Sequence, residues 1–146
     1  MYIKDKLEEF CKRNNHSFHV GNRQILNMLE RPDDYKCDQI YIMVERFVDT
    51  PLYSPTLGNR TQTAFSGEMF IVVKSDMDMP YYKEVDSVEC KNKLDHNILP
   101  LYKVRDSLEN FFICDDAEIR EFQTTSVTNI LDANFDGLYI RFNIVK

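Results

Sequence analysis

The stretch Asp136-Gly137-Leu138-Tyr139-Ile140-Arg141-Phe142-Asn143-Ile144-Val145 decides the fold class, because it joins a turn signal to a strand pattern. From Leu138 onward an apolar residue stands at every second position, which is the period of a half-buried strand. Asp-Gly directly before such an alternation is a strong hairpin signal. The sequence therefore predicts a closing hairpin, with strands near 117–130 and 137–145 joined by residues 132–137.

A second hairpin is predicted upstream. Residues 39–48 alternate around Ile40, Ile42 and Val44, and residues 62–74 show the same period of two. Between them, residues 49–61 hold two prolines and a glycine and are expected to form a long loop. Strand, loop and strand together indicate a hairpin with an extended tip, and loops of this length usually serve a function.

Helical periodicity appears in the segments between and before the hairpins. Residues 2–13 place apolar side chains on one stripe, and so do residues from about 100 to 113, with Pro100 in the first turn. A brief helix is expected at 23–30. Residues 75–97 are charged and weakly patterned, and are predicted to be a second long loop.

These segments predict an α+β fold. The order is helix, short helix, β-hairpin, helix, β-hairpin, which forms a four-stranded antiparallel sheet with the two main helices packed on one face. A chain of 146 residues suits one domain, so residues 1–146 are expected to be a single domain with long loops at 49–61 and 75–97.

Composition and charge exclude several function classes. The net charge is −6, from 18 basic and 24 acidic side chains, and no basic run is present, which disfavours sequence-specific binding to nucleic acid. No apolar stretch approaches the length of a membrane span, and the first residues do not resemble a secretory signal. Four widely spaced cysteines form no CxxC motif and are expected to be free thiols: Cys11, Cys37, Cys90 and Cys114.

Three patterns could suggest a metal, and each has a simpler interpretation. Asp132-x-Asn134-x-Asp136-Gly137 matches the first half of an EF-hand loop, but the twelfth position is Asn143 and the flanks look like strands. His16-x-x-His19, with Cys11 or Cys37 as a third ligand, lacks the second ligand pair that zinc prefers. The pair Asp76-x-Asp78 stands in a charged loop. We expect no bound metal and no cofactor.

No catalytic motif stands out in the sequence. It contains no GxSxG pattern and no Cys–His spacing pattern, and its four glycines are too dispersed to form a phosphate-binding loop. We expect that the protein is not an enzyme and that it has no catalytic residues.

The end of the chain resembles a known group of viral proteins. The segment SVTNILDANFDGLYIRF, residues 126–142, resembles the closing hairpin of tail-terminator, head–tail connector (neck ring) and minor tail proteins of tailed bacteriophages. Phe18-His19-Val20-Gly21, then Asn27, then the strand at 39–44 are similar to that group in their order. The extended segment 75–97 departs from its compact layout.

The resemblance implies a structural subunit that forms a homo-oligomeric ring of six or twelve copies at the head–tail junction or tail end. Its partners would be itself and portal, connector or tail proteins, and its location the virion, after assembly in the host cytoplasm. Interaction residues are expected in the two long loops, at Leu52, Tyr53, Leu57, Arg60, Met77, Met79 and Tyr81. The alternative is a cytoplasmic α+β adaptor or ligand-binding module without catalytic activity.

Overall fold

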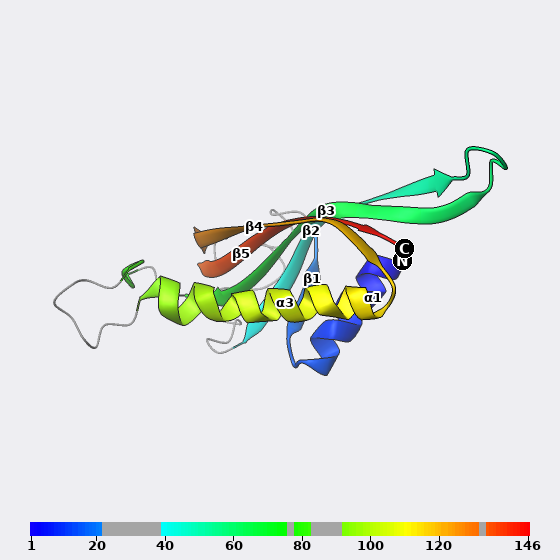
Figure 1. The fold of residues 1–146 in the computed structure, drawn as a ribbon. Coiled ribbons are helices and arrows are strands. Elements are labelled where there is room, and N and C mark those ends of the chain that lie inside the picture. The colour runs from blue at the N-terminus through cyan, green and yellow to red at the C-terminus, as the bar shows by residue number, and fades with distance from the viewer. Residues whose placement is uncertain (22–38, 76–77, 83–91, 132–133) are drawn as a thin grey trace.

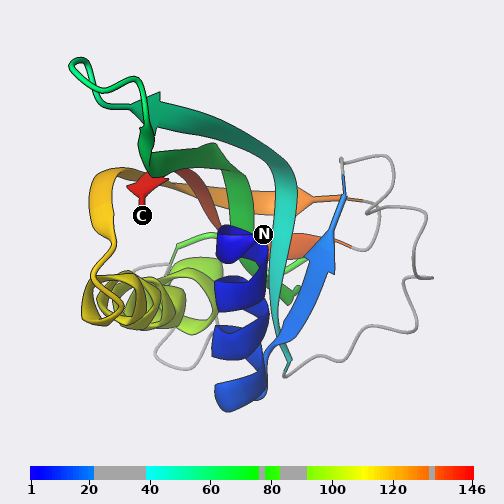
Figure 2. The same cartoon turned by 90° about the vertical axis from the view of Figure 1, so that its right-hand side faces the viewer.

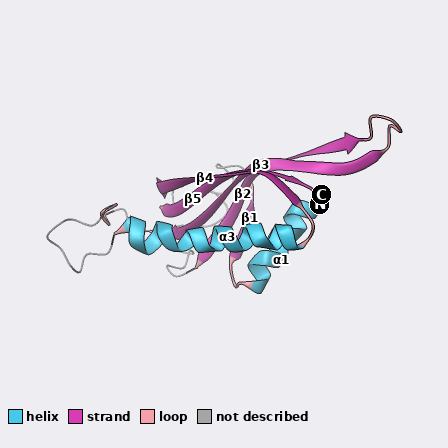
Figure 3. Cartoon of the chain, viewed as in Figure 1, coloured by secondary structure: helices cyan, strands magenta, loops and turns pink. Residues whose placement is uncertain are grey.

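The computed structural model describes residues 1–21, 39–75, 78–82, 92–131 and 134–146. Within these ranges the chain is an α+β protein with two α-helices and a five-stranded mixed sheet. Figures 1 and 3 show both helices on the same face of the sheet. The predicted fold class is therefore confirmed, and its finer description needs corrections to the sheet and to both long loops.

In chain order the elements are α1 (Tyr2–Arg13), β1 (Ser17–Val20), β2 (Ile40–Tyr53), β3 (Arg60–Lys74), the π-helical turn η2 (Leu94–Ile98), α3 (Leu99–Cys114), β4 (Glu118–Ile130) and β5 (Phe135–Val145). The helix predicted at 2–13 is confirmed, and so is the helix that carries Pro100 in its first turn. All four predicted strands are present. The short helix predicted at 23–30 lies outside the described residues.

The first correction concerns the sheet. Its strand order is β1-β2-β3-β5-β4, and β1 runs parallel to β2, whereas every other neighbouring pair is antiparallel. The prediction of four antiparallel strands was wrong because Ser17–Val20 is too short to show a strand period. Its pairing with residues 41–44 of β2 makes it a strand.

The second correction concerns the loop predicted at 49–61, because strand pairing continues through most of it and leaves only residues 54–59 unpaired. Pro51 lies opposite Thr63 in the β2–β3 ladder. The backbone N–H and C=O of Thr63 both bond to Lys146, at 2.8 and 3.0 Å, and so point away from β2. The missing N–H of Pro51 therefore costs the hairpin no hydrogen bond, and a proline that normally ends a strand is tolerated here.

The long loop predicted at 75–97 also ends earlier than expected, since η2 begins at Leu94 and leads directly into α3. Asn92 and Asp95 cap this turn reciprocally. The Asn92 side-chain oxygen accepts the Asp95 N–H at 2.8 Å, while its amide donates to the Asp95 carboxylate at 3.0 Å. Exchanges of this kind satisfy backbone groups at a helix start and fix where it begins.

The main core lies between the helices and the sheet (Figure 2). The stripe predicted on the first helix is confirmed, with Ile3 and Leu7 fully buried. From α3, Leu108 and Phe112 are fully buried, while Phe111 is only partly covered. On the opposite face, a second buried cluster gathers five side chains: Tyr41, Met43, Phe70, Val72 and Phe135.

Asp115, in the turn between α3 and β4, connects the helices to the last residue. Its carboxylate accepts a hydrogen bond from the Tyr2 hydroxyl at 2.7 Å and an ion pair from Lys6 at 3.1 Å, and Lys146 lies 3.7 Å away. The hydrogen bonds from Tyr2 and Lys6 hold the pKa of the Asp115 carboxyl below its ordinary value of 3.8. Burial and the bond to Asp115 raise the pKa of Tyr2.

This arrangement predicts a pH dependence of stability. Because the folded state lowers the pKa of Asp115, the contribution is present above the unfolded value of 3.8 and is lost as the pH falls through the folded value. Asp115→Asn should lower the free energy of unfolding at pH 7, and the difference from the wild type should vanish in acid. Urea unfolding from pH 7 to pH 2 measures this. A difference that persists unchanged at pH 2 would show that Asp115 acts through packing alone.

Candidate functional site

The β2–β3 hairpin extends well beyond the rest of the molecule (Figure 1). The β1 strand pairs with β2 only as far as Val44, and the last β3–β5 pair is Ala64 with Val145. We call residues 48–63 the arm. Within the described residues, the two strands of the arm pair with each other, and only Thr63 at the base also bonds through its backbone to Lys146.

The arm exposes apolar side chains that a folded chain usually buries. The exposed fractions of Val48, Tyr53 and Leu57 are 45%, 61% and 76%. The only charged residues in the arm are Asp49 and Arg60. Apolar side chains gathered on a projecting element are typical of a surface that contacts a partner.

The tip of the arm is an ordered turn. The N–H of Ser54 donates to the Asn59 carbonyl at 2.8 Å, and the N–H of Gly58 donates to the Ser54 carbonyl at 3.0 Å. Gly58 has a φ of +65°, a conformation that glycine adopts without steric cost. Behind the tip, the Arg60 guanidinium donates to the Thr63 hydroxyl. Leu57 is exposed within this ordered turn.

At the base of the arm, Gly67 allows β2 to lie unusually close to β3. The ladder shifts register between Val44 and Arg46, and Gly67 pairs with Phe47 just beyond that point. A Cβ at Gly67 would lie 1.9 Å from the Arg46 carbonyl oxygen and 3.0 Å from the ring of Phe142. Only glycine fits here, so the path of both strands into the arm depends on it.

The seven interaction residues predicted from the sequence fall into two groups. Tyr53, Leu57 and Arg60 are exposed on the arm, and Leu52 beside them is partly covered. In the second group Tyr81 is 47% exposed and Met79 is partly buried. Both lie beside η2, where the Leu94 N–H donates to the Tyr81 carbonyl at 3.0 Å and the Asn97 amide contacts the Met79 sulfur. Met77 lies outside the described residues.

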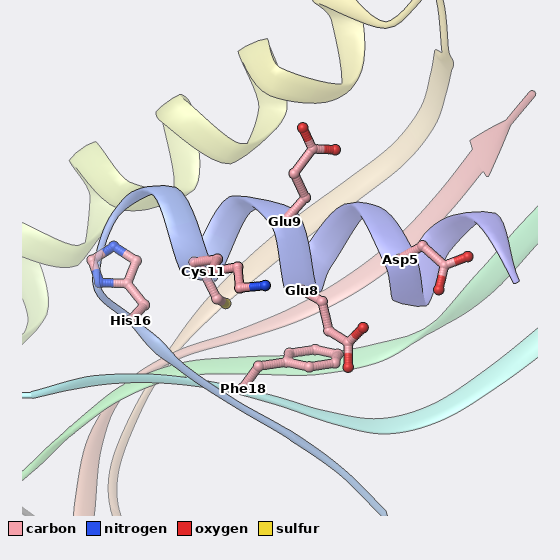
Figure 4. Close-up of a pocket in the computed structure, with 7 residues that line it drawn as sticks. Asp5, Glu8, Glu9, Cys11, His16 and Phe18 are labelled. Carbon is pink, nitrogen blue, oxygen red and sulfur yellow. The ribbon is translucent and has the colours of Figure 1, made fainter.

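A groove of about 540 Å³ lies between α1 and β1 (Figure 4). Figure 4 shows the ring of Phe18 beneath the carboxylate of Glu8, on one side of the helix. The lining is mostly polar and consists of three acidic residues, one lysine, a histidine, a cysteine and a phenylalanine: Asp5, Glu8, Glu9, Lys12, His16, Cys11 and Phe18.

Cys11 and His16, which were considered together as metal ligands from the sequence, line the same groove. Burial is the main reason that the pKa of the Cys11 thiol rises to about 12, and burial lowers the pKa of His16. The thiol is therefore protonated and the imidazole neutral at neutral pH. A reactive cysteine needs the opposite state, a thiolate stabilised by a nearby cation, so this pair is not an activated nucleophile.

Thiol alkylation should distinguish the two described cysteines. Cys11 is 2% exposed with a raised pKa, whereas Cys114 is exposed at the end of α3. We expect iodoacetamide at pH 8 to modify Cys114 at least about tenfold faster than Cys11, and the difference to disappear in urea. Peptide mapping by mass spectrometry reads each site separately. Equal native rates would contradict the burial of Cys11.

A buried ion pair lies where η2 meets the sheet. Lys93 is 3% exposed and Asp136 is 0% exposed, and the Lys93 ammonium lies 3.0 Å from one carboxylate oxygen and 3.1 Å from the other. The Lys93 ammonium also donates to the Asn129 side-chain oxygen at 2.7 Å and to the Ser75 hydroxyl at 3.2 Å.

Asp136 receives three further hydrogen bonds. The Ser75 hydroxyl and the Asn97 amide donate to one carboxylate oxygen, the latter at 3.1 Å, and the backbone N–H of Asn129 donates to the other at 2.9 Å. We call these five residues the Lys93–Asp136 network. It joins the ends of β3, β4 and β5 to η2.

The Lys93–Asp136 network gives Asp136, in the EF-hand-like pattern of the closing hairpin, a structural role. Both oxygens of Asp136 are occupied by protein donors and a lysine, so this carboxylate is not placed to coordinate calcium. Asn134 donates to the Ser75 carbonyl at 3.2 Å, which is also a structural bond. Asp132 lies outside the described residues.

The residues of the other two metal-like sequence patterns do not lie together within the described part of the chain. His16 lies in the groove, whereas His19 stacks on Tyr41 with ring centroids 6.0 Å apart. Among the residues that the structure describes, no group of three or more His, Cys, Asp or Glu side chains is placed to hold a metal ion. Cys37 and Asp76, which those patterns also involve, lie outside these ranges.

Comparisons with protein-family models, with curated proteins and with solved structures found no match to this chain. No helix in the described part of the chain is both long enough and apolar enough to cross a membrane.

Proposed function

We propose that the protein is a structural subunit of a tailed-phage virion that forms a homo-oligomeric ring of six or twelve copies at the head–tail junction or tail end. The observation that carries the proposal is the arm. It projects from the body and exposes Val48, Tyr53 and Leu57, which a partner would cover.

The layout of the chain supports contacts between unlike surfaces. The arm leaves one end of the sheet (Figure 1), while the body offers helices and strand edges elsewhere. A groove also lies between α1 and β1. When one surface of a subunit binds a different surface of the next, the contact repeats and closes into a ring if the rotation allows. The net charge of −6 would also keep such a ring from binding DNA that passes through it.

The resemblance of residues 126–142 to the closing hairpin of phage connector and terminator proteins adds a second line of support. The hairpin is present in the structure as β4 and β5. Portal, connector or tail proteins are the neighbours that the proposal implies, and the virion is the implied location.

Light scattering over a range of concentrations, followed by electron microscopy of the particles, tests the proposal. A discrete species of six or twelve subunits, unchanged by calcium, is the expected result. A chain that remains monomeric or dimeric at every concentration would favour the adaptor or ligand-binding module instead.

A further inference from the structure

We infer that the side chains of Lys93 and Asn129 join in an intramolecular isopeptide bond, with Asp136 as the proton carrier. The Lys93–Asp136 network is then a site of covalent self-modification as well as a structural contact. All of the reacting groups belong to one chain, so the inference does not depend on the proposed ring. It assigns a reaction to a buried amine that the proposed function leaves unused.

The Lys93 amine lies within reach of the Asn129 side-chain amide. The Lys93 Nζ is 2.7 Å from the Asn129 Oδ1. A carbonyl carbon lies about 1.2 Å from its oxygen, so the Asn129 Cγ is within about 4 Å of the amine nitrogen. Atoms about to react stand about 3–3.5 Å apart, and a small rotation of the Asn129 side chain completes that approach. Because the fold holds both groups, the reaction is unimolecular.

The proton that the Lys93 amine must lose has an acceptor in direct contact. The Asp136 carboxylate is 0% exposed, and its two oxygens lie 3.0 and 3.1 Å from the Lys93 Nζ. A base within hydrogen-bond distance of the proton is positioned to remove it. Transfer inside this pair replaces two buried charges by two neutral groups, so no charge has to leave the site.

Asp136 also positions the amide that is attacked. The carboxylate oxygen that lies 3.1 Å from Lys93 accepts the backbone N–H of Asn129 at 2.9 Å. Asn129 has a φ of +52°, and the register of the β4–β5 ladder shifts around it, between Val127 and Ile130. An irregularity of this kind redirects a side chain out of its place in the strand. Here the Asn129 side chain meets Lys93.

The reaction balances without a co-reactant. A bond forms between the Lys93 Nζ and the Asn129 Cγ, and the bond from that carbon to the amide nitrogen breaks. The lysine nitrogen begins as an ammonium and gives up two protons, which Asp136 passes to the departing nitrogen. That nitrogen leaves as an ammonium ion, and the carboxylate ends as it began. Asn129 is an exposed residue, so the product can escape to solvent.

The bond would change how the folded chain opens. It would link the turn that precedes α3 to the end of β4, at positions 36 residues apart in the sequence. A covalent link between distant positions restricts the unfolded chain and so favours the folded one. In a virion subunit it would keep η2 and β4 together under load.

Intact mass spectrometry tests the bond. The purified chain, incubated at neutral pH until its mass is constant, should be lighter than its sequence requires by about 17 Da, the mass of ammonia. Trypsin should then fail to cut after Lys93 and release one branched peptide that joins Lys93 to Asn129. A chain that keeps its full mass would overturn the inference. A loss of about 18 Da, the mass of water, would also overturn it, because it would place the bond on Asp136.

Three variants assign the loss of mass to its groups. Lys93→Arg keeps the positive charge but supplies no amine, and Asn129→Gly removes the amide while accepting the φ of +52°. Both should keep their full sequence mass. Lys103→Met removes an exposed lysine from α3 and should lose ammonia as the wild type does. Circular dichroism of each variant checks that it is folded.

The variants also exclude another source of the same change in mass. An asparagine that cyclises with its own backbone releases ammonia without any lysine. A loss of about 17 Da that persists in Lys93→Arg would therefore overturn the inference, whereas its absence from both Lys93→Arg and Asn129→Gly would support the bond.

Discussion

Replacing Lys93 with methionine is expected to lower the free energy of unfolding by about 3–5 kcal/mol, which is typical when one partner of a buried ion pair is removed. The substitution keeps the shape of the side chain but leaves the Asp136 carboxylate, which is 0% exposed, without its cation. Urea unfolding at pH 7, followed by circular dichroism, measures the loss.

Two further variants serve as controls for the predicted effect of Lys93→Met on stability. Lys103→Met removes an exposed lysine from α3 and should change stability by no more than about 0.5 kcal/mol. The double variant Lys93→Met with Asp136→Asn removes both charges but keeps a side-chain oxygen for the other donors, so it should be less destabilised than the sum of Lys93→Met and Asp136→Asn made singly. A double variant as unstable as the sum of the single ones would show that the charges do not act as a pair.

Gly67→Ala is expected to destabilise the fold by about 3 kcal/mol, because the added methyl group would overlap backbone rather than a movable side chain. The nearest atom would be the Arg46 carbonyl oxygen, at 1.9 Å. Relief requires β2 and β3 to separate where they enter the arm. Thermal and urea unfolding give the stability, and assembly measured in parallel should weaken as the arm is displaced.

Gly58→Ala is the matched comparison. A Cβ at Gly58 would meet no atom within 4 Å, so only its φ of +65° opposes the substitution. That strain amounts to about 1–2 kcal/mol. If Gly58→Ala cost as much as Gly67→Ala, the overlap with Arg46 would not be the reason that position 67 requires glycine.

The elements with a regular apolar period could be predicted from the sequence. The apolar stripe of the first helix begins at Ile3, and the apolar alternation of the last strand begins at Leu138. Both patterns correctly predict which side chains are buried. In each case one face of the element packs on the core, so the spacing of apolar residues along the sequence reveals whether the element is a helix or a strand.

The elements that depend on distant partners could not be predicted in this way. The four residues of β1 become a strand only by pairing with β2. Pro51 is tolerated because the register of the β2–β3 ladder places it opposite Thr63, whose backbone groups bond to Lys146 and point away from β2. The local conformational preferences of these residues predict neither feature, because contacts with distant parts of the chain override those preferences.

The candidate site also contains some residues that the sequence could predict and others that depend on distant partners. Tyr53 and Leu57 could be singled out as apolar residues in a turn-rich stretch, and both are exposed on the arm. The partnership of Lys93 with Asp136 spans 43 residues and follows no motif, so the sequence offered a polar hairpin turn for Asp136 but not its lysine partner. Similarly, nothing local indicates that Phe18 lines a groove with Glu8.

The strand order also bears on the sequence of events in folding. The β2–β3 hairpin closes through a loop of six residues, 54–59, and needs no other part of the chain to pair. By contrast, the network that joins the ends of β3 and β5 brings together Ser75 and Asp136, which are 61 residues apart. Short loops close at a lower entropic cost than long ones, so the hairpin is expected to form first and β5 to be added to its edge later. The element proposed to bind a neighbour would then emerge before the sheet that carries it is complete.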